Sequence, residues 1–306
     1  MYTLKLKPAL KDYLWGGTRL KTEFKMDTDL EKVAEAWVLS THKDGEGIVL
    51  NGELEGKTLT DAVSAFGVDC LGENGKKFSY FPILIKLIDA KDYLSVQVHP
   101  DDEYALKVEG EYGKTEMWYI VDCEDGACLY YGFKNEITKD EFRQKIADNT
   151  ITDVLNKVPV KKGDVYFIPA GTIHAIGSGI LIAEIQQNSN TTYRVSDYGR
   201  LGADGKPRPL HIDKAVEVTN LTPPPQTADL PEGVLAECDY FKVRIFGTEL
   251  QKEIEVDNSS FTALLCLDGE VSFNGITLVK GDCAFIPANS GKVTFNGKAT
   301  IIESRV

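Results

Sequence analysis

The sequence predicts a mainly β protein made of two β-barrels or sandwiches with a few short helices. The first observation is a repeat, because KGDVYFIPAG at 162–171 and KGDCAFIPAN at 280–289 are identical at seven of ten positions. Each copy indicates a Gly-Asp turn, a short buried strand and a turn at proline. The second observation is that Asn-Gly pairs stand between apolar alternating runs, in FNGITLVKGD and FNGKATIIES, which is typical of β-hairpins. Many short strands in two similar units favour paired barrels or sandwiches.

The composition agrees with a globular protein and excludes some classes of partner. The 306 residues suit one large or two medium domains, and 42% hydrophobic residues can form a core. A net charge of -13 argues against nucleic acid and anionic membranes, but not against a small anionic substrate bound by local cations. The sequence has no apolar run long enough for a membrane span and no apolar stretch of a secretory signal near its start. We therefore expect a cytoplasmic protein with its six cysteines free, and the oligomeric state is left open.

Helical spacing is confined to three segments, at 58–71, 138–158 and 209–219. The second begins with Thr138 and Glu141, which form the Thr-x-x-Glu pattern of a capping box. The segment 221–231 holds three consecutive prolines and is the predicted linker. The sequence thus predicts two domains, at 1–220 and 221–306.

The stretch LSVQVHP at 94–100 indicates a strand with one polar face. Gln97 and His99 share that face, because strand side chains alternate with a period of two, and the apolar residues lie on the other. Pro100 ends the strand, and Asp101 or Asp102 can cap the following helix. Both polar side chains can donate a lone pair to a metal. The simpler alternative for His99 is a hydrogen-bonded histidine on a half-buried face.

Two further residues extend this candidate metal site. Glu116 enters an apolar, aromatic strand on the same face as Lys114, and a buried carboxylate there needs a partner such as a metal. His174 lies three residues after the end of the first repeat copy, whereas the stretch after the second copy has no histidine. The remaining histidines, His42 and His211, are interpreted as a residue of an exposed loop and a structural residue at a helix start.

Gln97, His99, Glu116 and His174 are therefore the candidate ligands. Two imidazoles and a carboxylate suit a borderline divalent ion such as zinc, with a position left open for water or substrate. The amide oxygen of Gln97 is the weakest of the four ligands.

The chain resembles the type I mannose-6-phosphate isomerases (phosphomannose isomerases), in the short form common in Gram-positive bacteria. The matching stretches are YLWGG at 13–17, EAW at 35–37, FPILIKLIDA at 81–90, QVHP at 97–100, GKTEMW at 113–118, PAGTIH at 169–174 and EIQQNSNTTYR at 184–194. The resemblance implies two cupin domains, which are jelly-roll β-barrels. It implies a catalytic metal-binding domain at 1–220 and a degenerate one without metal ligands at 221–306. The long helical insertion of larger family members is missing.

The resemblance also implies roles for individual residues. It implies one Zn²⁺ per chain, a catalytic role for Arg194, Glu184 and Lys114, and substrate binding by Lys86, Lys114 and Arg194. The metal ligands that it implies are Gln97, His99, Glu116 and His174. Asn190 stands where many relatives have aspartate, and it is given no role.

The expected reaction interconverts D-mannose 6-phosphate and D-fructose 6-phosphate through a metal-assisted enediolate. It needs stabilisation of an oxyanion and transfer of a proton, which Glu184 could perform if burial raises its pKa. The phosphate needs a cation, and the sequence does not choose among Lys86, Lys114 and Arg194. The simpler alternatives are a lysine at position 86 that reaches toward solvent and an ion pair between Arg194 and Asp197.

Two other functions are compatible with the same ligands. A two-His-one-carboxylate set also suits an iron(II) cupin dioxygenase. A non-catalytic sugar- or metal-binding cupin could retain the ligands as well. The presence of Arg194, Lys114 and Glu184 argues against a mere binding protein, because binding needs no proton shuttle.

Overall fold

The structure is a computed structural model that describes residues 1–202, 205–225, 230–249 and 252–306. Its helices are short: α1 (Arg19–Thr22), α2 (Leu59–Phe66), α3 (Gly72–Gly75), α4 (Asp102–Val108), α5 (Lys139–Ala147) and α6 (Ile212–Val218). Three 3₁₀ turns lie at Gly52–Leu54, Val68–Leu71 and Ile151–Val154. Among the described residues no helix combines the length and the apolar character that crossing a membrane requires.

Strands dominate, as predicted. The strands of the first part are β1 (Leu4–Lys7), β2 (Ala9–Lys11), β3 (Glu35–Leu39), β4 (Ile48–Val49), β5 (Ile83–Ala90), β6 (Val96–Val98), β7 (Glu116–Cys123), β8 (Cys128–Phe133), β9 (Leu155–Pro159), β10 (Val165–Ile168), β11 (His174–Ala175), β12 (Ile180–Gln187) and β13 (Tyr193–Ser196). Those of the second part are β14 (Val234–Glu237), β15 (Lys242–Gly247), β16 (Glu253–Val256), β17 (Thr262–Phe273), β18 (Ile276–Val279), β19 (Cys283–Ile286), β20 (Gly291–Thr294) and β21 (Asn296–Arg305).

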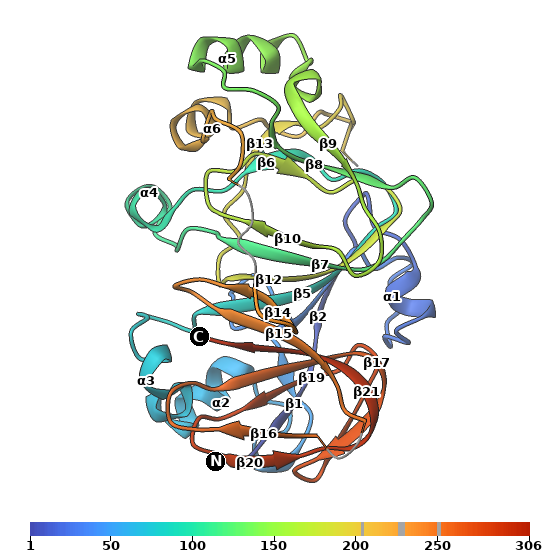
Figure 1. The fold of residues 1–306 in the computed structure, drawn as a ribbon, viewed down its shortest axis with the longest axis vertical. Coiled ribbons are helices and arrows are strands. Elements are labelled where there is room, and N and C mark those ends of the chain that lie inside the picture. Colours follow the sequence, from blue (N-terminus) through green and yellow to red (C-terminus); the bar gives the residue numbers. More distant parts are fainter. Residues whose placement is uncertain (203–204, 226–229, 250–251) are drawn as a thin grey trace.

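Two antiparallel sheets form the N-terminal barrel. One has the strand order β10-β7-β12-β5-β3-β2 and the other β13-β6-β11-β8-β9. In Figure 1, α5 and α6 lie above the five-stranded sheet, and the C-terminal strands lie below the six-stranded sheet. Apolar residues of α5 and α6 pack in one cluster with those of β6 and β13. The five-stranded sheet is therefore covered on its outer face by helices.

The six-stranded sheet is buried on both faces, and its strands alternate between them. On β12, Ala183 and Ile185 pack in the cluster that also holds apolar residues of β1, β17 and β19. Ile182 packs in a second cluster with Leu94 and Leu129, inside the N-terminal barrel. Glu184 is two residues from Ile182 and therefore faces the barrel interior. The sheet that supports the interior site thus also forms the interface with the C-terminal strands.

The repeat is a structural repeat, as the sequence predicts. Gly163 and Gly281 have φ values of 91° and 93°, in the left-handed region that favours glycine. Each donates its N–H to a facing strand, over 2.8 Å to the carbonyls of Ile120 and of Cys266. The carboxylate after each glycine accepts a hydrogen bond from the N–H three residues earlier, in both cases at 2.9 Å. The repeated Lys-Gly-Asp therefore builds the same turn before β10 and β19.

The helices agree in part with the predicted segments. Thr138 caps α5 by accepting a hydrogen bond from the N–H of Glu141 at 3.1 Å, and α6 lies within the predicted 209–219. The predicted helix at 138–158 is wrong beyond Ala147. Asn149 has φ 55°, which ends the helix, and the chain then enters β9, which pairs with β8. Pro100 ends β6 as predicted, and Asp101 caps α4 through the N–H of Tyr104.

The described part of the C-terminal half does not stand alone as a sheet. Strands β1 and β4 belong to the eight-stranded sheet that contains β14, β15, β17, β18, β19 and β21. The predicted domain boundary after residue 220 stays a prediction, and residues 226–229 of the predicted linker lie outside the described residues. All six cysteines are free, as expected.

Candidate functional site

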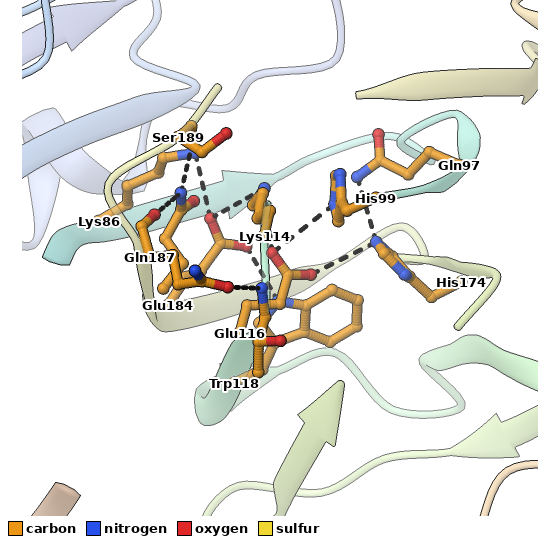
Figure 2. A network of polar contacts seen from close by, with 12 residues as sticks. Lys86, Gln97, His99, Lys114, Glu116, Trp118, His174, Glu184, Gln187 and Ser189 are labelled. Atoms are coloured by element: carbon orange, nitrogen blue, oxygen red, sulfur yellow. Dashed lines mark hydrogen bonds and ion pairs between the residues drawn. The ribbon is translucent and has the colours of Figure 1, made fainter. Parts of the chain in front are cut away.

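The predicted site residues meet between the two sheets of the N-terminal barrel. Figure 2 shows Lys86, Lys114, Glu116 and Glu184 on one side, and Gln97, His99 and His174 on the other. Lys86 and Glu184 are cross-strand partners on β5 and β12, and Gln97 and His174 are partners on β6 and β11. Because each pair shares a position in its ladder, the period of two carries both members into the interior.

His99, Glu116 and His174 form a compact group that could hold a metal ion. Their ligand atoms all lie within 4.8 Å of one another, and all three side chains are buried. Nε2 of His174 is 3.3 Å from Oε1 of Glu116, and Nε2 of His99 is 3.7 Å from Oε2. No other group of three or more histidine, cysteine or acidic ligands with this geometry occurs in the described residues.

The hydrogen bonds made by Nδ1 of each histidine put a lone pair on Nε2, the atom that can bind a metal. Nδ1 of His99 is 2.8 Å from the carbonyl of Thr191, and Nδ1 of His174 is 2.9 Å from the carbonyl of Thr172. A carbonyl can only accept, so each Nδ1 carries the proton and each Nε2 presents a lone pair. Burial lowers the pKa of His174 to about 4 and that of His99 well below its usual value. Both rings are thus neutral, as metal ligation requires.

The polar atoms of this group lack partners that a cation would supply. Nε2 of His99 and both carboxylate oxygens of Glu116 are buried without a hydrogen bond from any described residue. Burial raises the pKa of Glu116 to about 7, although the ammonium of Lys114 lies 3.0 Å away and opposes this shift. Burial thus outweighs the nearby ammonium, and a further positive charge would stabilise the ionised carboxylate. The residues therefore fit a divalent cation.

Gln97 borders this group through its amide nitrogen. Its Nε2 lies 3.3 Å from Nε2 of His174, while its Oε1 is 3.4 Å from the hydroxyl of Ser95. The oxygen is the only atom of the amide that can bind a cation. Ligation by Gln97 therefore requires its amide to turn by 180°.

Buried groups of alternating charge connect Glu116 of the metal group, on β7, to Glu35 on β3 across the six-stranded sheet. In order they are Glu116, Lys114, Glu184, Lys86 and Glu35, with successive N–O distances of 3.0, 3.8, 3.1 and 3.8 Å. All five side chains are at least nine-tenths buried. The alternative that Lys86 reaches toward solvent is therefore wrong. Its pKa lies above the usual value, because Glu184 and Glu35 outweigh the effect of burial.

The raised pKa on which proton transfer by Glu184 was made conditional is not found. Burial acts in that direction, but the ammonium groups of Lys114 and Lys86 lower the pKa to about 2. The indole N–H of Trp118 also donates to Oε2 at 2.9 Å. Glu184 is thus a carboxylate at neutral pH, which can accept a proton.

A cavity of about 290 Å³ opens onto these groups. Gln97, Lys114 and Glu184 line it, and so do Arg194 and Arg208. Its other lining residues are Tyr13, Trp15, Glu35, Lys86, Ile88, Leu94, Ser95, Ile176, Asn190 and Thr192. The cavity therefore joins a cluster of proton-transfer groups to two guanidinium groups.

The two arginines are held in different ways. Arg208 is fixed by Asp197, with Nε 2.7 Å from Oδ2 and Nη2 2.5 Å from Oδ1. Arg194 donates from Nη1 to the carbonyl of Pro209 at 3.0 Å, and its buried Nε has no partner among the described residues. The alternative ion pair between Arg194 and Asp197 is therefore wrong, because Asp197 is occupied by Arg208 and Arg200.

The sequence interpretation missed Arg208 and Glu35. Arg208 comes from the irregular segment GKPRPLH, where neither strand period nor a turn indicates its direction. Glu35 lies in the matching stretch EAW and was given no role. Strand alternation was a signal that could have placed it on the same face as Trp37. The prediction that His42 is exposed is wrong, since its ring is buried against Trp37, with centroids 5.7 Å apart.

Comparisons with known proteins agree with this arrangement. Residues 3–126 match the model of the phosphomannose isomerase type I catalytic domain, and 232–306 match that of the mannose-6-phosphate isomerase cupin domain. The chain is 37% identical to a mannose-6-phosphate isomerase of Streptococcus mutans, over 98% of this chain and 97% of the relative. It is also 37% identical to one of Bacillus subtilis, over 99% and 98%.

Solved structures give the same result. The crystal structure of the mannose 6-phosphate isomerase from Bacillus subtilis matches with a TM-score of 0.90 and 35% identity, covering all of both chains. A phosphomannose isomerase variant from Salmonella typhimurium has a TM-score of 0.82 at 18% identity, over 99% of each chain, and shows the fold alone.

Proposed function

The chain belongs to the type I phosphomannose isomerase family, and we propose that its barrel interior interconverts D-mannose 6-phosphate and D-fructose 6-phosphate. The enzyme is an aldose-ketose isomerase with cupin domains. The observation that carries the proposal is the buried group of His99, Glu116 and His174, which contacts two residues of the cavity wall, Gln97 and Lys114. Glu184, Arg194 and Arg208 line the same cavity. This arrangement supports metal binding, proton transfer and anion binding in one place.

The resident metal in this proposal is one Zn²⁺ per chain. His99, Glu116 and His174 would hold it, with Gln97 as a fourth ligand after its amide turns. Two neutral imidazoles and a carboxylate are typical zinc ligands and leave a position for substrate. When bound, the ion supplies positive charge that polarises the sugar oxygens.

Glu184 is the proposed acid/base residue. Lys114 and Lys86 keep it ionised, which leaves it able to accept a proton but makes it a weaker base than a carboxylate with a raised pKa. In this proposal it takes a proton from one carbon of the aldose and returns it to the neighbouring carbon of the enediolate. Lys114 lies 3.8 Å from Glu184 and 3.0 Å from Glu116, where its ammonium can stabilise the developing oxyanion. The side chains of Lys114 and Glu184 are both 4% exposed, and burial strengthens the electrostatic effect.

The phosphate is assigned to the two guanidinium groups. Arg194 lines the cavity with a buried, unpartnered Nε, and Arg208 is held rigidly by Asp197. Guanidinium groups match phosphate oxygens in bidentate pairs. Lys86 is less suited, because Glu184 and Glu35 already flank its ammonium. Arg194 is thus proposed as a substrate-binding residue, its catalytic role stays a prediction of the sequence, and Lys86 lowers the pKa of Glu184.

A coupled assay tests the proposal. The purified protein is mixed with mannose 6-phosphate, and fructose 6-phosphate is measured before chelation, after chelation and after zinc is restored. We expect turnover that chelation abolishes and zinc restores. Absence of turnover by the metal-loaded protein would refute the isomerase, and oxygen consumption on a substrate panel would then favour the dioxygenase. A cytoplasmic location stays a prediction of the sequence.

A further inference from the structure

Glu35 is a buried carboxylate in the cavity that the proposed reaction leaves unused. It is the first residue of β3 and ends the series of alternating charges opposite the metal group. Its side chain is about one-tenth exposed, and it lines the cavity together with Tyr13 and Trp15. A charged group with so little exposure is normally paired, so an oxygen of Glu35 that has no protein partner would point to a ligand.

Only one of the two oxygens of Glu35 is engaged. Oε2 accepts a hydrogen bond from the indole N–H of Trp37 at 2.6 Å and lies 3.8 Å from Nζ of Lys86. Trp37 is fully buried, so this bond fixes the orientation of the carboxylate. Oε1 makes no hydrogen bond or ion pair with any described residue, and it is not fully buried. Oε1 is thus a fixed, charged acceptor that the cavity can reach.

A hydroxyl group is the partner that suits this oxygen. An ionised carboxylate accepts short, strong hydrogen bonds from hydroxyl groups and repels a phosphate. In the proposed substrate, C1 and C2 react and C6 carries the phosphate, while the oxygen at C5 closes the ring of the predominant form. The hydroxyl groups at C3 and C4 remain for recognition.

We propose that Glu35 is a substrate-binding residue whose Oε1 accepts a hydrogen bond from the C3 or C4 hydroxyl of the sugar. The inference rests on the proposed isomerase function and adds to it a determinant of which hexose phosphates are accepted. An epimer that directs this hydroxyl elsewhere leaves the charged oxygen unpaired in a desolvated cavity. Such a site rejects the wrong analogue strongly, because its polar group then loses its partner.

The alternative role for Glu35 is to position Lys86 through their ion pair. A cycle of enzyme variants and substrate analogues separates this role from substrate binding. The kcat/KM values of wild type and Glu35→Ala are measured with mannose 6-phosphate and with its 3-deoxy and 4-deoxy analogues. We expect wild type to lose about 10- to 100-fold on one of the analogues, the effect of a charge-assisted hydrogen bond. In Glu35→Ala, the kcat/KM values for that analogue and for mannose 6-phosphate should differ by no more than about threefold.

The ratio of kcat/KM for mannose 6-phosphate to kcat/KM for each analogue is compared between wild type and Glu35→Ala. Equal ratios in the two proteins for both analogues would overturn the inference, since loss of Lys86 positioning slows all substrates alike. If the alanine variant does not fold, Glu35→Gln is used, which retains an acceptor oxygen without its charge and should give an intermediate ratio. Metal content and Tm are compared for every variant. Absence of wild-type turnover on mannose 6-phosphate would instead refute the isomerase itself, and this inference with it.

Discussion

Replacement of Lys86 by methionine tests whether the buried charges stabilise one another. Lys86 is 4% exposed and lies 3.1 Å from Glu184 and 3.8 Å from Glu35. Methionine retains much of the length of the side chain and removes its charge. The nearest remaining cation to Glu184 would be Lys114, at 3.8 Å. Breaking a buried ion pair by removing one partner costs about 3–5 kcal/mol, because the other charge stays buried without compensation.

The corresponding change in Tm follows from the length of the chain. An unfolding entropy of about 2.1 cal/mol/K per residue gives about 0.64 kcal/mol/K for 306 residues. Lys86→Met should therefore lower the Tm of the chelated protein by about 5–8 °C at pH 8, as measured by calorimetry. Lys91→Met is the control, because Lys91 and Glu124 form an ion pair in which both side chains are mostly exposed. We expect no measurable change from that control.

The difference in Tm between wild type and Lys86→Met should depend on pH through the pKa of Glu184. In wild type the pKa of Glu184 is lowered to about 2, so its stabilisation is complete above its unfolded pKa and is lost only as the pH falls through about 2. In the variant the unpaired carboxylate has a raised pKa and takes up a proton as the pH falls. The difference in Tm should therefore be smaller at pH 5 than at pH 8. A change below about 2 °C at pH 8, or an increase in Tm, would refute the view that Lys86 compensates these carboxylates.

Three further changes have defined outcomes. Glu116→Gln should lower the zinc content after dialysis to well below one per chain, as measured by mass spectrometry, and full retention would contradict its role as a ligand. Burial raises the pKa of Asp197, but Arg208 and Arg200 together outweigh this and lower it. The stability that these ion pairs contribute is complete above the unfolded pKa of Asp197 and is lost as the pH falls through its folded pKa. Asp197→Asn should therefore reduce the fall in Tm at acid pH. The same fall in the variant as in wild type would argue against this role of Asp197. The ring Nδ1 of His211 accepts a hydrogen bond from the backbone N–H of Arg194 at 3.1 Å, and the backbone N–H of His211 donates to the Arg194 carbonyl at 2.8 Å. His211→Ala should reduce kcat/KM about 10-fold at unchanged metal content, and His211→Asn should recover part of it.

The features that sequence could predict are those set by local periodicity. The repeat revealed two similar units, because Gly163 and Gly281 need the same positive φ and each following aspartate closes the same turn. Strand alternation placed Gln97 and His99 on one face and Glu116 on the face of Lys114, and the difference between the two repeat copies singled out His174. These inferences depend only on neighbours within a strand or turn.

The features that sequence could not predict depend on contacts between distant segments. The pKa of Glu184 is lowered because β5 and the segment before β7 bring two lysines to it, and burial alone would have the opposite sign. The end of α5 was missed because pairing of β9 with β8 overrides helical spacing after Asn149. Arg208 enters the cavity from an irregular segment whose direction is fixed by its ion pair with Asp197.

The central claim is that His99, Glu116 and His174 hold the metal that the isomerase uses. Anomalous diffraction at the zinc absorption edge, from crystals of protein that is active in the coupled assay, tests it most directly. We predict one peak per chain, surrounded by Nε2 of His99, Nε2 of His174 and the carboxylate of Glu116. A peak at another position, or none in crystals of fully active enzyme, would contradict the proposed metal site.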